Sequence, residues 1–263
     1  GVKTLAAGTT SISGNFAMSG TASATAVVGL TIGGNFTLGA GTSFTTGSFT
    51  HTIGGDFTNN GGTFTSTGST VVLNRSGAQA VGGTTTPAVF NNLTLGGSGA
   101  KAFNVVLNVA ATLTINTGVQ ADPGSITTHT SNALRLGSNP VPAGTWGSTS
   151  SAATNQNDTF FVAGTTGIIT VATGAFAYFS RASGAWNDPA TWSTVDFGDP
   201  TNAGTFPGVT DEANIGGGFT VTVTGSSSAA AVTFQAVAST NNTLAVNAGQ
   251  TLAVSGAITI PRN

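Results

Sequence analysis

Apolar residues recur along the first part of the chain at a nearly constant spacing. The segments SISGNF, TIGGNF and TIGGDF begin at Ser11, Thr31 and Thr52, so the spacing is first 20 and then 21 residues. A period near 20 is too short for a pair of repeated helices or for a propeller blade. The pattern therefore predicts stacked coils of two or three strands each, with these apolar positions in common: Ile12, Ile32, Ile53, Phe16, Phe36 and Phe57.

The same spacing continues in weaker form to about residue 136. Successive coils stacked at the strand spacing of about 4.8 Å would bury a continuous apolar column. We expect Ile12, Ile32, Ile53 and Leu73 to form one inward column, and Phe16, Phe36 and Phe57 another. The weaker ladder has Leu73, Leu93 and Leu113 at steps of 20, Leu95 and Ile115 also at a step of 20, and Leu134 and Leu136 about one period later.

The paired glycines that precede an asparagine or aspartate predict a tight corner in each coil. Glycine would supply the positive φ that such a corner needs. Asn15, Asn35 and Asp56 then occupy equivalent turn positions. Stacked side chains at these positions can hydrogen-bond along the column, and Asp56, as one charge among neutral neighbours, is expected to break this ladder chemically.

Polar and apolar residues alternate with the strand period of two in other segments, such as residues 63–66 and 220–224. Thr, Val, Ile and Phe, which favour strands, are abundant, whereas glutamate occurs once. The sequence therefore predicts an all-β chain, a parallel β-solenoid (β-helix) with coils of about 20 residues and an irregular middle segment. A β-sandwich is the alternative, but its turn signals recur every ~8–12 residues without a constant coil phase.

Interruptions of this pattern predict four segments. Residues 1–136 form a first β-solenoid block, and residues 137–179, with Pro140 and Pro142, form a closing loop and strand segment. Residues 180–212 form an irregular connector rich in Trp and Asp, and residues 213–263 form a second β-solenoid block.

Several segments have a distinctive style. Two coil-like units span residues 52–62 and 77–95, and VPAGTWG follows at 141–147. SGAWNDPATW lies at 183–192, followed by FPGVTDE at 206–212. Together these segments resemble the coils, closing element and opening element of the Gly/Thr/Asn-rich repeats in very large cell-surface and adhesin proteins of Bacteroidetes-type bacteria, and the resemblance covers nearly the whole chain. It implies β-helix domains of exported adhesins, gliding-type surface filaments and matrix fibres, often delivered by type IX secretion. The sorting domain that this system reads is not visible in the sequence.

Charged residues make up only 5% of the chain, against about 25% in an ordinary soluble domain. The six Lys and Arg residues argue against nucleic acid as a partner, because it requires a cationic surface. No apolar run is long enough for a membrane-spanning helix, and there is no cysteine. The composition suits an extracellular or cell-surface location. The first residue is Gly1 rather than Met, so we expect a mature form, a fragment or the ordered part of a longer protein.

Candidate catalytic residues are scarce, and we expect no enzyme. Nucleophilic catalysis needs Cys, or Ser with a His and an acid. His51 and His129 are expected on solvent-facing positions of Thr-rich strands, with no neighbour to tune a pKa. Glycan-cleaving β-helices need clustered carboxylates or basic residues, yet residues 4–55 carry no charged side chain. The prediction is therefore that the chain has no catalytic residue and no cofactor-binding residue.

One group of acidic residues lies in and beside the connector. Asp196, Asp199, Asp211 and Glu212 could hold a structural Ca²⁺ through their oxygens, together with Asp188 and Asn202. Alternatively they cap turns beside Pro and Gly. The spacing matches neither an EF-hand nor a nonapeptide calcium repeat.

Trp186 and Trp192 also allow two interpretations. They could form a platform on which sugar rings stack, or they could plug the end of a solenoid, as Trp146 could. If a ligand binds at all, the irregular stretches 137–165 and 183–212 are the expected places.

Taken together, these features predict an extracellular structural protein, a segment of a fibre or adhesin stalk. Solenoid ends without a cap expose strand edges that template pairing, so we expect self-association, head to tail, into filaments or within a longer parent chain. A glycan-binding adhesin module that uses the irregular loops is the alternative. An ice-binding face is disfavoured because Thr50/Thr52, Thr63/Thr65 and Thr84–Thr86 are not expected to share one coil phase.

Overall fold

The computed structural model describes residues 2–4, 10–137, 139–174, 176–204, 206–236 and 241–261, and of residues 2–4 the backbone alone. Strands account for 47% of the structure and helix for 1%. The strands stack in parallel as a β-solenoid of about 11 turns with ~21 residues per turn, which confirms the predicted fold class. Expectations that involve Gly1 or the last two residues lie outside the described residues.

The chain divides into two compact units, and this division differs from the four expected segments. The first unit holds Gly1–Ser138 and Ala143–Ala172, and the second holds Asn139–Pro142 and Thr173–Asn263. Most of the expected closing segment thus completes the first unit. The connector 180–212 belongs to the second unit, because its two tryptophans are buried in that unit's core.

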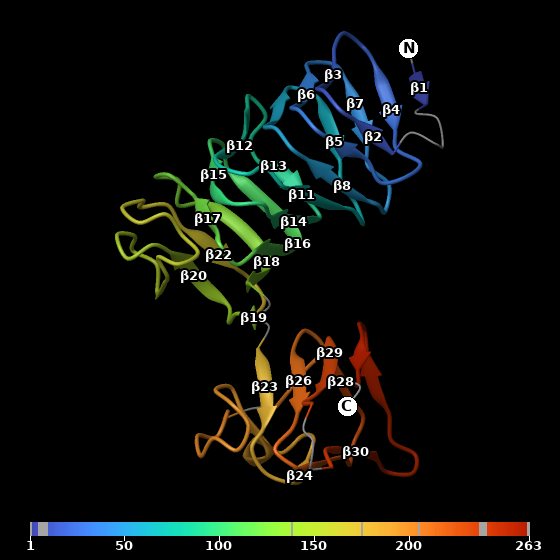
Figure 1. Cartoon of the computed structure of the whole chain (residues 1–263), viewed down its shortest axis with the longest axis vertical. Helices are drawn as coiled ribbons and strands as arrows, with labels where there is room; N and C mark the ends of the chain where they lie inside the picture. Colours follow the sequence, from blue (N-terminus) through green and yellow to red (C-terminus); the bar gives the residue numbers. More distant parts are fainter. Residues whose placement is uncertain are drawn as a thin grey trace. The chain divides into compact units, whose positions relative to one another are not determined.

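Three parallel sheets form the sides of the first unit, coloured from blue to yellow-green in Figure 1. The first sheet contains β1 (Val2–Thr4), β4 (Ser23–Thr25), β7 (Ser43–Thr45) and β10 (Thr63–Thr65). The second contains β2 (Ser11–Ile12), β5 (Thr31–Ile32), β8 (Thr50–Ile53), β11 (Thr70–Leu73), β13 (Ala88–Phe90), β14 (Asn92–Leu95), β16 (Leu107–Ile115), β18 (His129–Leu136), β22 (Ile169–Val171), β20 (Gly144–Gly147) and β21 (Asn155–Gln156). The third contains β3 (Phe16–Met18), β6 (Phe36–Gly39), β9 (Phe57–Asn60), β12 (Gln79–Gly83), β15 (Gly99–Phe103) and β17 (Val119–Asp122).

The predicted isoleucine column is confirmed. Ile12 pairs with Ile32, Ile32 with Ile53, and Ile53 with Leu73. The step expected from Leu73 to Leu93 is wrong, because Leu73 pairs with Leu95 and Leu93 pairs with Val71. The reason is a longer coil at this point: Thr70 pairs with Asn92, 22 residues further along the chain. From Leu93 onward the expected pairing with Leu113 holds.

The phenylalanine column is confirmed as well. The rings of Phe16 and Phe36 lie parallel with centroids 5.1 Å apart, and those of Phe36 and Phe57 lie 5.3 Å apart. A second column, Phe44 over Phe64, packs edge-on against the first. Aromatic pairs of this geometry contribute about 0.5–1.5 kcal/mol beyond the area that they bury, so the aromatic columns stabilise the first coils.

The glycine corners exist, but the expected reason for them was wrong. Neither Gly34 nor Gly55 has a positive φ. A Cβ at Gly34 would collide with the Asn15 side chain of the coil before it, and a Cβ at Gly55 would collide with Asn35. Glycine is required because successive corners touch, a condition that depends on the neighbouring coil and not on local backbone conformation.

A ladder of hydrogen bonds runs through these corners. The backbone N–H of Asn35 donates to Asn15 Oδ1, and that of Asp56 donates to Asn35 Oδ1, both at 2.8 Å. The N–H of Ala80 donates to Asp56 Oδ1 at 2.9 Å. The expected bonding along the column is present, but it joins each side chain to the next backbone. Asp56 keeps the ladder intact, because its carboxylate accepts just as the amides do.

Antiparallel pairing terminates the main sheet of the first unit. β22 pairs with β18 in parallel, but β20 pairs with β22 in the antiparallel direction. Trp146 lies on β20 with 9% of its surface exposed. The segment after residue 143 therefore closes this end of the solenoid.

The second unit, orange to red in Figure 1, is a shorter stack with its own core. One of its sheets contains β25 (Trp192–Ser193), β23 (Ala177–Ser180), β26 (Glu212–Ile215), β29 (Ala231–Phe234) and β32 (Ile258–Thr259). The others contain β24 (Gly184–Ala185), β27 (Thr220–Val223) and β30 (Thr243–Val246), and β28 (Ser227–Ala229) and β31 (Leu252–Val254). A single turn of 3₁₀-helix, η1, spans Pro189–Thr191, and the short strand β19 spans Asn139–Pro140.

Candidate functional site

The two histidines are buried, and the expectation that they face solvent was wrong. His51 is 3% exposed and His129 is fully buried. His51 pairs with the inward residue Val71, and His129 pairs with Ile169. The alternation of the strand contains this signal, because His51 lies two residues before the inward Ile53 and therefore on the same face.

Both imidazoles bridge successive parts of the coil in the same way. The N–H of Leu30 donates to His51 Nδ1 at 3.3 Å, and His51 Nε2 lies 2.9 Å from the carbonyl oxygen of Thr46. A backbone N–H can only donate, so Nδ1 is unprotonated and Nε2–H donates to the carbonyl. His129 repeats the arrangement, with Leu107 N–H donating to Nδ1 at 3.0 Å and the Pro123 carbonyl 3.3 Å from Nε2.

Each histidine is held in its neutral form. Burial lowers the pKa of His51 and of His129, although each backbone carbonyl works in the opposite direction. A cavity of about 10 Å³ beside His51 is lined by Phe36, Phe44 and other uncharged residues, and it is at the lower limit for one water molecule. The histidines therefore act as structural bridges with no space for a substrate beside His51.

Lys101 is a second inward polar residue, and the sequence reasoning missed it. It is fully buried, and its Nζ donates to the carbonyl oxygens of Arg75 at 2.8 Å and of Gly77 and Ser98 at 2.9 Å. These bonds use all three protons of the ammonium group. Burial lowers the pKa of Lys101, and the charge of Arg75 lowers it further. The alternation again contained the signal, since Lys101 lies two residues before the inward Phe103.

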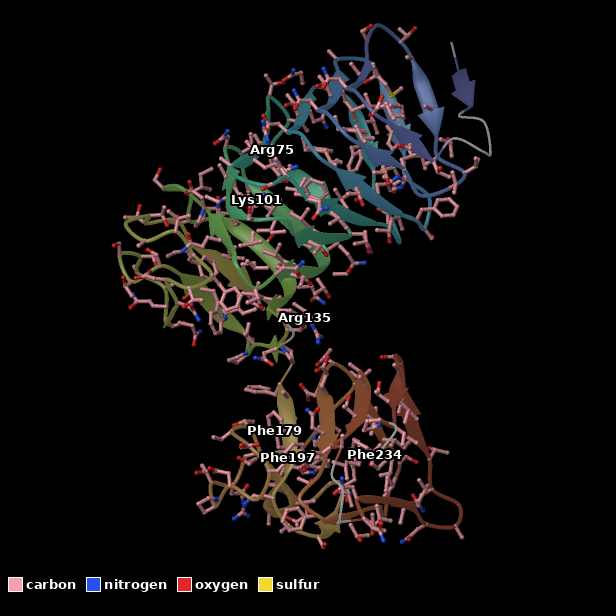
Figure 2. The ribbon with its side chains drawn as sticks, in the orientation of Figure 1. Arg75, Lys101, Arg135, Phe179, Phe197 and Phe234 are labelled. Atoms are coloured by element: carbon pink, nitrogen blue, oxygen red, sulfur yellow. The ribbon has the colours of Figure 1, made fainter. Side chains whose placement is uncertain are left out.

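The charge of the acidic corner residue Asp56 is partly neutralised by Arg75, the residue whose carbonyl oxygen binds Lys101. Arg75 Nη1 lies 3.6 Å from Asp56 Oδ1, and both side chains are exposed to solvent. Figure 2 shows Arg75 and Lys101 near each other on the corner of the coils. An exposed pair of this kind contributes little to stability. The buried ammonium and its three carbonyls are the stronger feature of this corner.

The structure does not support the calcium site. Asp211 is 8% exposed, and its two carboxylate oxygens each accept a backbone N–H at 2.8 Å, from Phe176 and from Gly208. Burial raises the pKa of Asp211 against the effect of these two bonds. Both oxygens are thus already used to join two backbone segments of the second unit.

The other expected calcium ligands cap turns or lie on a strand. Asp196 accepts from the N–H of Phe197 and Asp199 from that of Thr201, both at 2.7 Å, and the bonds from Thr201 lower the pKa of Asp199. Glu212 is the first residue of β26, and its side chain is half-buried. Within the described residues, no three His, Cys, Asp or Glu side chains gather where they could hold a metal ion. The capping alternative is the one that the structure favours.

Trp186 and Trp192 do not form a surface platform, so the expected sugar-binding role is wrong for these two side chains. Both are fully buried. The indole N–H of Trp192 donates to the Trp186 carbonyl at 2.7 Å, and that of Trp186 donates to the Pro207 carbonyl at 3.2 Å. The rings meet edge to face at 5.2 Å. The pair belongs to the core of the second unit together with Val221 and Val223, so the rings are core residues and not a surface.

A hollow lies in the described part of the second unit. It has a volume of about 380 Å³ and no charged residue in its lining, which includes Pro140, Pro142, Phe176, Phe179 and Val195. The rings of Phe179 and Phe197 meet edge to face with centroids 5.2 Å apart, and both residues are labelled in Figure 2. Its walls are mostly apolar, with Asn139 and Thr194 as the polar lining residues, and no titratable side chain lines it.

Several threonine and serine side chains form regular rows along the sheets of the first unit. Thr50 pairs with Thr70, and Thr31 pairs with Thr52. Thr50 and Thr52 lie on β8 of the second sheet, Thr63 and Thr65 lie on β10 of the first, and Thr84–Thr86 follow β12 of the third. The expectation that these three groups share no coil phase is therefore confirmed. On the first sheet two ranks follow the solenoid axis, exposed or half-buried: Ser23, Ser43 and Thr63, and Thr25, Thr45 and Thr65.

Comparison with family models, with curated proteins and with solved structures finds no match to this chain. In the part of the chain that the structure describes, no helix has the length and apolar character needed to cross a membrane. The function must therefore be argued from the solenoid itself.

Proposed function

We propose that the chain is an extracellular structural protein without enzymatic activity, a segment of a fibre or adhesin stalk built of stacked β-coils. The observation that carries this proposal is the unbroken inward column of the first unit. It runs in register from Ile12 to Leu136 across the second sheet of that unit. Such a column gives each coil the same neighbours above and below, so coils add length without adding a new kind of surface.

The polar interior supports the same role. His51, His129 and Lys101 use their nitrogens to bond backbone groups of other coil segments. Polar groups that are satisfied in this way rigidify a core and specify its packing. Each of these side chains is committed to the scaffold, which suits a segment whose task is to keep its length and shape.

The extracellular part of the proposal rests on composition and on the resemblance to bacterial surface repeats. Only six Lys and Arg residues occur in 263 positions, so a trypsin-like protease finds few cleavable bonds. A neutral surface of Thr, Ser, Asn and Gly has few charges for other molecules to pair with. Both properties favour a protein that persists outside the cell.

Immunogold labelling of the producing cells tests this location and role. Antibodies raised against the purified chain are expected to label fibres or the outer surface of intact cells. Label that appears only after the cells are permeabilised would overturn the proposal. A glycan array tests the adhesin-module alternative, and with Trp186 and Trp192 buried we expect no bound glycan. Binding that Phe179→Ala abolishes would instead assign the hollow to a glycan.

A second candidate function is suggested by the ranks of hydroxyl groups on the first sheet. Thr25, Thr45 and Thr65 repeat at the strand spacing of about 4.8 Å, with Ser23, Ser43 and Thr63 two residues away, or about 6.6 Å. A rigid lattice of this kind can order water on its surface, as an ice-binding face does. Thermal hysteresis of the purified chain tests it: loss of hysteresis in Thr45→Lys would support this function, and no hysteresis in the wild type would exclude it.

A further inference from the structure

Two buried polar side chains occupy the same position in successive coils of the first unit. Gln79 on β12 pairs in register with Lys101 on β15. Gln79 is 2% exposed and Lys101 is fully buried. Both residues lie just after the corner at which the chain passes from the second sheet to the third, so both can reach the backbone of the neighbouring corner.

Lys101 connects its own coil to the coil before it. Its ammonium group donates to the carbonyl oxygens of Arg75 and Gly77, which lie 26 and 24 residues earlier in the chain, and to that of Ser98 in its own coil. Hydrogen bonds from a charged donor are roughly twice as strong as bonds between neutral groups. These bonds therefore close residues 75–101 into a loop.

Gln79 makes the same connection one coil earlier. Its Nε2 donates to the carbonyl oxygens of Ile53 and Gly55, again 26 and 24 residues earlier. Its Oε1 accepts the backbone N–H of Arg75 at 3.1 Å. Arg75 is thus held on both sides, because Gln79 binds its N–H and Lys101 binds its carbonyl oxygen.

Tension on a solenoid acts first on the contacts between neighbouring coils. Each coil contacts only its neighbours, so a pulled chain opens coil by coil. The strand ladders and the apolar columns recur throughout the first unit, whereas the bonds from Lys101 add three charge-assisted contacts at one place. The coil that contains them should therefore need the longest time or the greatest force to open.

We propose that Gln79 and Lys101 are latches, buried side chains that keep one coil closed on the coil before it, and that Lys101 sets the resistance of the first unit to tension. This inference rests on the proposed structural role and identifies how that role is performed. While the Lys101 bonds last, the 26-residue step from Arg75 to Lys101 withholds roughly 90 Å of chain, at about 3.3–3.6 Å per residue.

Single-molecule stretching at constant force tests the latch. The chain has no cysteine, so two introduced cysteines can carry the handles without a competing thiol. Thr65→Cys/Thr130→Cys brackets Lys101 and all three of its carbonyl partners. Thr25→Cys/Thr65→Cys brackets only earlier coils and is the control for pulling position. The three threonines are exposed, so the handles do not disturb the core.

The 65/130 pair should show a pause followed by a step of roughly 90 Å, the length withheld by the loop. Lys101→Met should shorten this pause roughly 100-fold, because three bonds to a charged donor are lost. The same substitution should leave the 25/65 pair unchanged.

Lys101→Gln is the conservative variant. Gln79 shows that a glutamine at this position can bond the preceding corner, so the pause should shorten by no more than about 10-fold. This variant also carries the test if circular dichroism shows that Lys101→Met does not fold, since a pause equal to that of the wild type would then overturn the inference.

Leu93→Ala separates the latch from general stability. Leu93 is fully buried and lies between the handles at 65 and 130, so its truncation should lower stability in urea through a cavity. Apolar burial is largely retained in a typical unfolding transition state, whereas a latch must already be broken there. Leu93→Ala should therefore shorten the pause less than Lys101→Met does for the same loss of stability.

An unchanged pause in Lys101→Met would overturn the inference. So would equal effects of this variant on the two handle pairs, or an equal shortening by Leu93→Ala at equal loss of stability. These results are separate from the cell-labelling experiment. Surface label with no effect of Lys101→Met on the pause refutes the latch alone, and a working latch with label confined to the cell interior refutes the extracellular role alone.

Discussion

The buried histidines make the stability of the first unit depend on pH between neutral and mildly acidic conditions. Protonation of Nδ1 in His51 or His129 would turn the acceptor for the Leu30 or Leu107 N–H into a second donor. Burial lowers both pKa values below the ordinary 6.5. Below pH 6.5 the unfolded chain therefore binds more protons than the folded chain, so stability falls as the pH falls.

The size of the effect follows from the number of protons. Each histidine contributes at most about 1.4 kcal/mol for every pH unit between its ordinary and its folded pKa. The unfolded histidine is half protonated at pH 6.5 and mostly protonated at 5.5, so two histidines reduce the free energy of unfolding by up to about 2 kcal/mol over this interval. That loss is a large part of the 5–15 kcal/mol typical of a folded domain.

The titrations of Asp158 and Asp211 do not interfere with the effect of the two histidines. The bonds from Thr149 lower the pKa of Asp158 in the first unit below the ordinary 3.8, so its contribution is lost only in stronger acid. The raised pKa of Asp211 has the opposite sign, because the folded state then binds the extra proton. Asp211 lies in the second unit, so it does not affect the first.

Urea unfolding at a series of pH values from 7.5 to about 5 tests this reasoning. Far-ultraviolet circular dichroism follows both units. Fluorescence of a Trp146→Phe variant follows the second unit alone, because Trp186 and Trp192 remain there. The unfolding transition of the first unit is expected to move to lower urea concentration as the pH falls. The double variant His51→Gln/His129→Gln should remove this dependence, since glutamine can accept and donate the same bonds without titrating. Equal pH slopes for the wild type and the double variant would refute the argument.

Three further substitutions follow from the packing. Phe36→Ala should lower the free energy of unfolding by about 3–5 kcal/mol in chemical denaturation, whereas the exposed Phe206→Ala should change it by no more than about 0.5 kcal/mol; similar losses would contradict the stacked column. Lys101→Met leaves three carbonyl oxygens without a donor and should lower the free energy of unfolding by about 3 kcal/mol or more. An unchanged urea midpoint would show that the bonds from the Lys101 ammonium group are not needed for stability. Gly55→Ala should lower the free energy of unfolding by about 1–3 kcal/mol, because the new Cβ collides with the preceding corner. Gly14→Ala is the control, at the same coil position but with open space around it, and should be neutral. Equal melting temperatures of the two variants would refute the role of contact between corners.

The burial of polar residues shows how far the alternation of a strand can be trusted. His51 and Lys101 each lie two residues before an inward apolar residue, so the period of two already placed them inside. Their Thr-rich surroundings nevertheless predict solvent-facing positions for the two histidines. The hydrogen-bond partners of His51 and Lys101 are backbone groups about one coil away. Their presence depends on how coils stack, and no local pattern reports it.

In the connector 180–212, by contrast, the sequence pattern could not decide between two interpretations. The sequence sets Trp186, Trp192 and Asp211 apart from the coils, but their positions along the chain are compatible both with a ligand site and with a core. The structure decided for the core, because coils of the second unit cover the indole rings. It also separated the acidic residues, since each carboxylate of Asp196, Asp199 and Asp211 is used by nearby backbone N–H groups.

The sequence by itself determined the coil period, the all-β class and the inward columns, because every coil repeats the same apolar positions and the repeat is visible in one dimension. Only the tertiary structure decided why the corners need glycine and where the longer coil shifts the leucine register. Each of these depends on contacts between residues about 20 or more positions apart. Such contacts arise from the stacking of one coil on the next, and stacking is a property of the folded chain.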